Sequence, residues 1–98
     1  MPGRNYRRGY RAELKAREEL ERQGYLVVRA AGSKGPVDLV AVGPDGVRLI
    51  QVRRTRRGSN GLASALRELE RVPAPPGVTR EAWLWRDKEG FVAKERLA

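Results

Sequence analysis

The sequence contains no cysteine and no histidine, and these two absences exclude several classes of enzyme. Without cysteine the chain has no disulfide, no thiolate nucleophile and no thiolate metal ligand. Without histidine it has no Ser-His-Asp triad and no imidazole site for zinc. A metal ion in this protein would therefore be a hard ion held by oxygen atoms, and Mg²⁺ or Mn²⁺ is the expected cofactor.

Long apolar runs are also missing. No stretch approaches the roughly 20 apolar residues that span a bilayer, and residues 1–4, Met-Pro-Gly-Arg, lack the apolar core of a signal peptide. We therefore expect a cytoplasmic protein without a membrane partner.

The length of the chain, 98 residues, is enough for one domain, which we place at residues 1–98. A domain of this size buries only about 60 to 65% of the surface of its unfolded chain, which leaves little margin of stability. Pairing with a second copy would bury more surface, so we expect a homodimer.

Arginine is the residue type in excess. Lys and Arg total 21 against 12 Asp and Glu, which gives a formal net charge of +9, and 17 of the 21 are arginine because the chain has only four lysines. The planar guanidinium group contacts phosphates through two hydrogen bonds at once, so nucleic acid is the leading expected partner. A basic protein that associates only non-specifically would have the same net charge, and this alternative stays open.

Hydrophobic periodicity and turn residues predict seven elements. Ala12, Ala16 and Leu20 form one i, i+4, i+8 row that runs toward a glycine, as expected of an amphipathic helix with a glycine C-cap. Residues 43–46, Gly-Pro-Asp-Gly, have the composition of a type I turn, which makes the apolar runs on either side a hairpin. The predicted elements are a helix over 9–23, strands over 25–29, 37–42 and 47–55, a helix over 61–71, and strands over 81–85 and 90–93. The fold class is therefore α/β.

Three polar side chains interrupt the apolar strands at positions that a hairpin brings together. Asp38 lies at the start of its strand, and Gln51 and Arg53 lie near the end of the next one. Because alternate residues of a strand share a face, a hairpin in register places all three on one face. A carboxylate beside a polar-x-basic triplet is how metal-dependent phosphodiesterases hold a divalent ion next to an attacking water. Taken alone, Asp38 would be read as an aspartate that ends a loop or caps a helix, and its context favours a metal ligand.

A series of short motifs follows a fixed order in the first half of the chain. They are Arg7-Arg8-Gly9 with Ala12-Glu13, Gly24-Tyr25-Leu26-Val27-Val28-Arg29, Gly32-Ser33-Lys34, Val37-Asp38-Leu39-Val40-Ala41, and Ile50-Gln51-Val52-Arg53. Through them, residues 6–57 resemble the archaeal Holliday junction resolvases of the PD-(D/E)XK nuclease superfamily. The resemblance implies a restriction-endonuclease-like core, with a central mixed β-sheet flanked by helices in the order α-β-β-β-α-β-β. It also implies a dimeric, structure-selective endonuclease that acts on branched DNA in recombination and repair.

The resemblance implies a metal site with three oxygen ligands. Asp38 would be the principal ligand, Glu13 would approach the ion or its water from the first helix, and Gln51 would contribute its amide oxygen. Family members have glutamate at the place of Gln51. An amide brings no negative charge, so we expect this site to hold a hard dication less tightly.

The resemblance also implies contacts to phosphate. Ser33 and Arg29 would contact the cleaved or neighbouring phosphate, and Arg53, where the family has lysine, would stabilise its charge without releasing a proton. Other basic residues near the two ends of the predicted site would bind the DNA backbone. These are Arg4, Arg7, Arg8 and Arg11 around the start of the first helix, Lys34, and Arg54, Arg56 and Arg57 around the end of the third strand. Charges that protect an edge strand from aggregation are the other reading of Arg54 and Arg56.

Two functions remain open at this point. The first is a metal-dependent endodeoxyribonuclease, and the second is a nuclease fold that has lost its activity and only binds nucleic acid. An RNA-binding domain is a weaker alternative, because Gly-x-x-Gly at residues 32–35 falls between two strands instead of two helices. Trp83 and Trp85 share one strand face, and we expect them to pack in the core or a dimer interface instead of stacking on bases.

Overall fold

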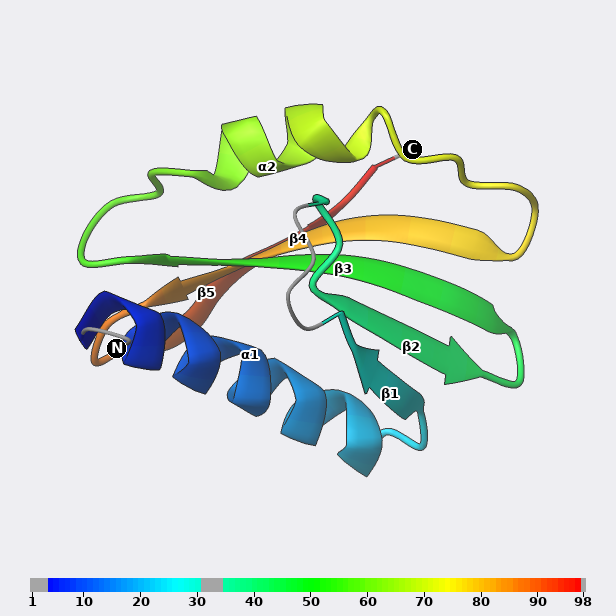
Figure 1. The fold of residues 1–98 in the computed structure, drawn as a ribbon, viewed down its shortest axis with the longest axis horizontal. Coiled ribbons are helices and arrows are strands. Elements are labelled where there is room, and N and C mark those ends of the chain that lie inside the picture. Colours follow the sequence, from blue (N-terminus) through cyan, green and yellow to red (C-terminus); the bar gives the residue numbers. More distant parts are fainter. Residues whose placement is uncertain (1–3, 31–34, 98) are drawn as a thin grey trace.

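The strands of the protein form one five-stranded sheet in the order β1-β2-β3-β4-β5, with a helix on each face (Figure 1). The computed structural model describes the backbone of residues 4–30 and 35–97 and the side chains of residues 10–30 and 35–97. The elements are α1 (Arg4–Arg22), β1 (Leu26–Arg29), β2 (Leu39–Gly43), β3 (Gly46–Thr55), α2 (Leu62–Leu69), β4 (Val78–Arg86) and β5 (Gly90–Arg96). The β3–β4 pair is parallel and the other three pairs are antiparallel. The predicted α/β class, the mixed sheet and the order of elements are confirmed.

Helix α1 covers one face of the sheet with the row of small and apolar residues that the sequence predicted. Ala12, Ala16 and Leu20 are fully buried, and the last two pack in one cluster with residues from β1 to β4, including Trp83. The helix ends where Gly24 takes a left-handed φ of 96° and the Tyr25 amide donates to the Leu20 carbonyl at 3.1 Å. This i to i−5 bond is the Schellman form of a helix C-terminus, which favours glycine.

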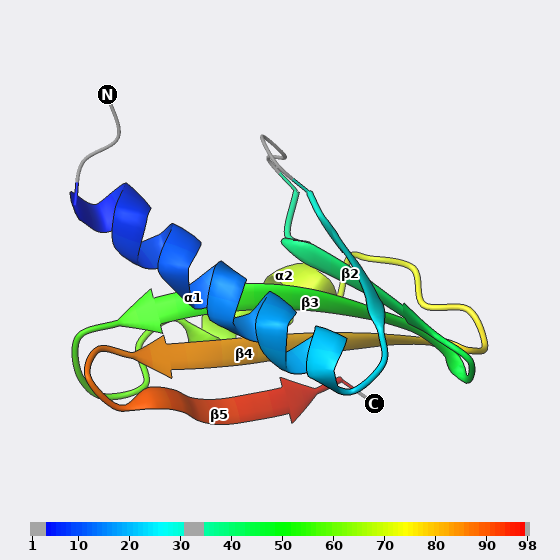
Figure 2. The same ribbon diagram turned by 90° about the horizontal axis from the view of Figure 1, so that it is seen from below.

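Helix α2 supplies the crossover that a parallel pair of strands requires, and it covers the opposite face. Its Ala65 and Leu69 are fully buried and pack against Ala82 of β4. Figure 2 shows α1 in front of the sheet and α2 behind it. In the described part of the chain, neither helix is long and apolar enough to cross a membrane.

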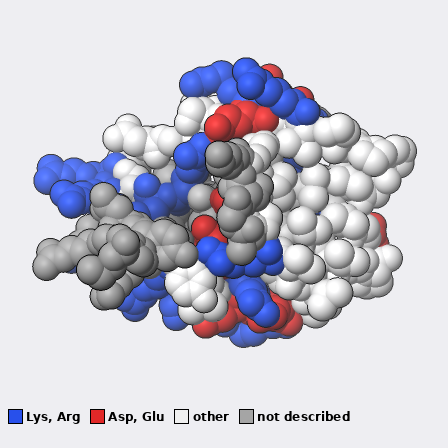
Figure 3. All heavy atoms as spheres, in the orientation of Figure 1, with Lys and Arg blue, Asp and Glu red and all other residues white. Residues whose placement is uncertain are grey.

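The face on the α2 side is uncovered over β1 and β2. Leu26, Val28 and Val42 there are 68%, 53% and 40% exposed. Figure 3, drawn in the orientation of Figure 1, shows an uncharged surface over the β2–β3 hairpin. This half of the sheet therefore presents apolar side chains to solvent.

Strand β3 continues past the end of its partner β2. The β2 register ends at the pair Leu39 and Ile50, whereas β3 pairs with β4 as far as Thr55. Residues 51–55 therefore have a strand on only one side, and this free edge of β3 is where the predicted site residues lie.

Some predicted boundaries were wrong. Helix α1 begins at Arg4 instead of residue 9, so the arginines expected before the helix lie inside it. Gly9 lies inside the helix, which is tolerated because one glycine costs a helix only about 1 kcal/mol relative to alanine. Strand β4 begins at Val78 instead of residue 81, because parallel pairing with Val47 of β3 extends it.

Candidate functional site

At the end of the β2–β3 ladder, the side chain of Asp38 accepts a hydrogen bond from the backbone of β3. Its backbone amide donates to the Ile50 carbonyl at 2.9 Å, and its Oδ2 accepts from the Val52 amide at 2.7 Å. Bonds to residues 50 and 52 place Asp38 opposite Gln51. The carboxylate thus occupies the position at which the next backbone acceptor of β2 would otherwise stand.

The hairpin register is the one that the strand alternation required. Val40 pairs with Leu49 and Val42 with Val47. Even-numbered residues of β2 therefore share a face with odd-numbered residues of β3, which include Gln51 and Arg53. The expected proximity of Asp38 to this triplet is confirmed, with Asp38 at the strand end where the ladder opens.

The carboxyl group of Asp38 is difficult to ionise. Its pKa is raised from 3.8 to about 6, with burial as the largest cause and the nearby carboxylate of Glu13 acting in the same direction. The hydrogen bond from Val52 and the charges of Arg53 and Arg29 act in the opposite direction but do not cancel the rise. Shifted pKa values of this kind are frequent at functional sites, where burial and charged neighbours act on one group.

Gln51 and Arg53 share a third partner, Glu68 of α2. The Nε2 of Gln51 donates to the Oε2 of Glu68 at 3.1 Å, and the Nη2 of Arg53 donates to the same oxygen. The bond from Gln51 and the charge of Arg53 lower the pKa of Glu68, so this carboxylate stays ionised. Glu68 therefore fixes both side chains from the α2 side.

The bond from Gln51 to Glu68 determines which polar atom of the Gln51 side chain has no hydrogen-bond partner. Gln51 is only 6% exposed, and with its Nε2 used, its Oε1 is buried without a hydrogen-bond partner. The Nε of Arg53 is buried without a partner as well. Unpaired buried polar atoms are costly and uncommon in folded proteins. Gln51 thus offers a free oxygen acceptor on the residue opposite Asp38.

Glu13 approaches from the other side of the sheet. It lies on α1, whereas Gln51 and Arg53 lie on the α2 face, so a single shared face for all four residues is not what the fold provides. The Oε1 of Glu13 accepts from the Nε of Arg29 at 2.9 Å, and the guanidinium of Arg29 lies 4.8 Å from the centroid of the Tyr10 ring. Asp38 is close to both sides of the sheet, since the charges of Glu13 on one side and of Arg53 on the other both influence its pKa.

The oxygen donors of this region fit a hard dication in part. Among the described residues, no group of three or more acidic side chains is gathered for metal binding. The Asp38 carboxylate and the unpaired Oε1 of Gln51 belong to residues on opposite positions of the two strands, and Glu13, ion-paired with Arg29, is close enough to influence the pKa of Asp38. Mg²⁺ in phosphoryl-transfer sites is commonly bound by one or two carboxylates, with water and substrate phosphate completing its shell. Two or three protein oxygens are therefore enough.

Glu68 was missed at the level of sequence. The helix over 61–71 was read only as part of the architecture, because the resemblance ends before it. The available signal was position: Glu68 directly precedes Leu69, which is buried, so it borders the stripe that packs on the sheet. Glu68 also lies between Arg67 and Arg71 in the sequence, and an acidic residue at this position is a candidate counter-ion for the arginines of β3.

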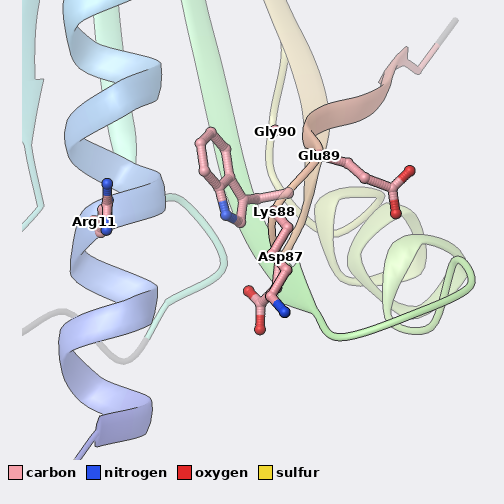
Figure 4. A pocket seen from close by; sticks show the side chains of 6 residues that line it. Arg11, Asp87, Lys88, Glu89 and Gly90 are labelled. Carbon is pink, nitrogen blue, oxygen red and sulfur yellow. The ribbon is translucent and has the colours of Figure 1, made fainter.

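The basic residues predicted to bind DNA have different environments. Arg54 forms a two-bond ion pair with Asp87 at 2.6 and 3.0 Å, while Arg56 and Arg57 are exposed. Arg11 on α1 lines a pocket of about 650 Å³ together with Trp85 and the β4–β5 turn (Figure 4). The side chains of Arg4, Arg7 and Arg8, and the whole of Ser33 and Lys34, fall outside the described residues.

Trp83 lies in the interior of the protein, whereas Trp85 lies nearer its surface. Trp83 is 1% exposed and belongs to the α1-side core, which confirms its expected packing role. Trp85 is half-buried and packs edge-to-face on Phe91 with ring centroids 5.0 Å apart.

No protein-family model matches the chain, and no curated protein sequence matches it. The resemblance to the resolvases thus depends on the motifs of residues 6–57 alone. What bears on function is the geometry around Asp38, Gln51, Arg53 and Glu68.

Proposed function

We propose that the protein is a divalent-metal-dependent endonuclease that resembles the Holliday junction resolvases. One observation carries the proposal: the Asp38 carboxylate, with a pKa raised to about 6, lies opposite Gln51, whose buried Oε1 has no hydrogen-bond partner. A bound dication would relieve both unfavourable features at once. It would favour the ionised form of Asp38 and give the Gln51 oxygen a partner.

Each residue has a role in this proposal. Asp38 and the Oε1 of Gln51 would hold Mg²⁺ or Mn²⁺, and Glu13 would contact the ion or its water from α1. The ion, when bound, supplies positive charge at the scissile phosphate and makes a coordinated water more acidic. Arg53 stabilises negative charge that develops on the phosphate, and as a guanidinium it keeps its proton and takes no part as a base.

The proposed substrate is branched DNA. The proposed location is the cytoplasm, as expected from the sequence. The exposed Arg56 and Arg57 follow the free edge of β3 that carries Gln51 and Arg53. Phosphate contacts of this kind position a nucleic acid without reading its bases. Selection of a junction would then depend on shape.

We propose that two copies pair through the uncovered apolar face. Leu26, Val28 and Val42 on that face are exposed, and a two-fold dimer presents two identical sites to the two opposed strands of a junction. Sedimentation at micromolar concentration is expected to show a species of twice 11.0 kDa. A single 11 kDa species at that concentration would contradict the dimer.

A second function, nucleic-acid binding without cleavage, is favoured by a different observation. Glu13 and Glu68, the acidic side chains flanking Asp38 and Gln51, are both ion-paired with arginine. Their negative charge is therefore already compensated, and Asp38 alone is left to attract a metal ion. In this case Gln51 and Arg53 serve as polar contacts to phosphate.

The assay that separates these functions uses labelled four-way junction, flap and linear duplex, with Mg²⁺, Mn²⁺ or a chelator. We expect wild type to nick the branched substrates with either metal and to leave them intact with the chelator. Gln51→Glu restores the charge of the family pattern, so it should nick faster at low Mg²⁺. Binding without nicking by wild type, with nicking gained by Gln51→Glu, would support the second function. Nicking that continues in the chelator would contradict a metal-dependent mechanism.

A further inference from the structure

The outer side of α2 carries a basic pocket that the proposed active centre does not include. It has a volume of about 380 Å³ and is lined by Arg53, Ser64, Arg67, Glu68 and Arg71. Arg67 lies in the last turn of α2, Arg71 lies in the turn that follows the helix, and both line this pocket. Figure 3 shows basic side chains gathered over the part of the molecule where Figure 1 places α2.

The charges in this pocket are unbalanced. Three guanidinium groups face one carboxylate, which gives 3 − 1 = +2 for the lining residues. Glu68 already accepts from Arg53 and Gln51. Arg67 and Arg71 are exposed and have no ion pair within the described part of the chain. They are thus available to an anion in a way that Arg54, held by Asp87, is not.

Two hydrogen-bond donors of the pocket differ in whether they have a partner. The Oγ of Ser64 already donates to the Gly61 carbonyl at 3.1 Å. The Nε of Arg53 is buried without a hydrogen-bond partner. An oxygen-rich ligand in the pocket could satisfy that donor, which no described protein group does.

We propose that this pocket binds a phosphate of the nucleic-acid backbone, held by Arg67 of α2, by Arg71 in the turn after α2 and by Arg53 of β3. The inference extends the proposed function, since its ligand is the same nucleic acid. Arginine pairs with phosphate through two charge-assisted hydrogen bonds, which suits exposed guanidinium groups that line one pocket. Arg53 belongs both to this pocket and to the proposed active centre. A phosphate bound in the pocket is therefore a neighbour of the phosphate at Asp38 on the same nucleic-acid strand.

Glu68 has a defined part in this site. In the free protein it is the counter-ion of Arg53, and a phosphate in the pocket competes with it for that guanidinium. Removing the charge of Glu68 therefore strengthens phosphate binding, whereas removing the charges of Arg67 and Arg71 weakens it. The two changes have opposite signs, and this distinguishes a binding site from a general effect of mutation on folding.

The test measures binding of labelled four-way junction and duplex in chelator, where no cleavage interferes, at several salt concentrations. Arg67→Ala/Arg71→Ala is compared with Arg17→Ala/Arg22→Ala, which removes the same charge from exposed positions of α1. We expect the first pair to weaken binding by about tenfold and to reduce the slope of log K against log salt by about 2. The α1 pair should change both by much less, and Glu68→Gln should bind more tightly than wild type.

The outcomes separate this inference from the proposed function. Equal losses in the α2 and α1 pairs would mean that only total charge matters and would overturn the phosphate site. Weaker binding by Glu68→Gln would overturn it as well, since Glu68 would then not compete with the ligand. If wild type binds and nicks DNA while Arg67→Ala/Arg71→Ala is unchanged, the pocket assignment alone fails. If wild type binds no nucleic acid, both proposals fail. Circular dichroism of each variant confirms that the fold is intact.

Discussion

Asp38→Asn will nick a four-way junction about 10³-fold more slowly than wild type in Mg²⁺, because a catalytic dication is worth several kcal/mol and each 1.36 kcal/mol is tenfold in rate. Asparagine can still accept the 2.7 Å bond from the Val52 amide, so the end of the ladder is preserved. Binding should be at least as tight as in wild type, because a negative charge beside the phosphates is removed. Single-turnover cleavage and a binding titration in chelator measure the two effects separately.

The same substitution will stabilise the metal-free protein, in a pH window set by the pKa of Asp38. That pKa is about 6 in the folded protein against 3.8 for the free side chain. Between these values the folded state holds more protons than the unfolded state, so stability falls as pH rises and stays lower above pH 6. Asparagine avoids this loss. Since the side chain is partly exposed and screened, we expect a gain of about 1 kcal/mol at pH 8, or about 4–8 °C in Tm.

Well below pH 3.8 the Tm values of the two proteins should converge, because Asp38 is then neutral in both folded and unfolded states. Asp45→Asn is the matched control, since Asp45 is an exposed aspartate in the β2–β3 turn. It should leave the rate of cleavage unchanged. Cleavage by Asp38→Asn at the wild-type rate would identify a contaminating nuclease or a different centre.

Arg48→Met will destabilise the fold by about 3–5 kcal/mol, because it leaves a buried carboxylate without its cation. Glu81 is 4% exposed, and its two oxygens accept from Arg48 at 2.7 and 2.8 Å. Trp83 and Thr79 donate to the same carboxylate at 3.2 and 3.1 Å. Burial by itself raises the pKa of Glu81, but the bonds from these donors outweigh it and leave the pKa below its ordinary value. Urea denaturation at pH 7 measures the loss.

Two further variants serve as controls for Arg48→Met. Arg54→Met breaks a similar two-bond ion pair, but the Asp87 side chain in that pair is 25% exposed against 5% for Glu81, so its loss should be well under half as large. Arg48→Met combined with Glu81→Gln removes both charges and should recover much of the stability. The cost of Arg48→Met should also shrink in acid, since Glu81 becomes protonated as pH falls. A loss below about 1 kcal/mol at pH 7 would mean that Arg96, 3.6 Å from Glu81, compensates for Arg48.

Local patterns were sufficient to predict the elements and the hairpin. The row of Ala12, Ala16 and Leu20 defined the buried face of α1, and the turn at residues 43–46 fixed the register that brings Asp38 opposite Gln51. Both are short-range signals that tertiary packing did not override. The sequence therefore predicted where the central pair of the site would lie.

Contacts between elements could not be predicted in the same way. Which face each helix covers is decided by the crossover between β3 and β4, and this put Glu13 on the face opposite Gln51 and Arg53. The bonds from Gln51 and Arg53 to Glu68, and from Arg48 to Glu81, join residues of different elements. No periodicity within one element reports them, because they follow from how α2 and β4 are laid beside β3.

The bonds that hold the site together span short stretches of chain. Val52 and Asp38 are 14 residues apart, Arg53 and Glu68 are 15 apart, and Gln51 and Glu68 are 17 apart. The bond between Lys94 and Glu19, by contrast, closes a loop of 75 residues. The entropy lost on closing a loop grows with its length, so the polar centre has a low contact order and can assemble before the chain ends are docked. The three bonds that join Asp38, Gln51, Arg53, Val52 and Glu68 lie within one contiguous segment, residues 38–68, so new chain termini placed outside that segment would leave their connectivity unbroken.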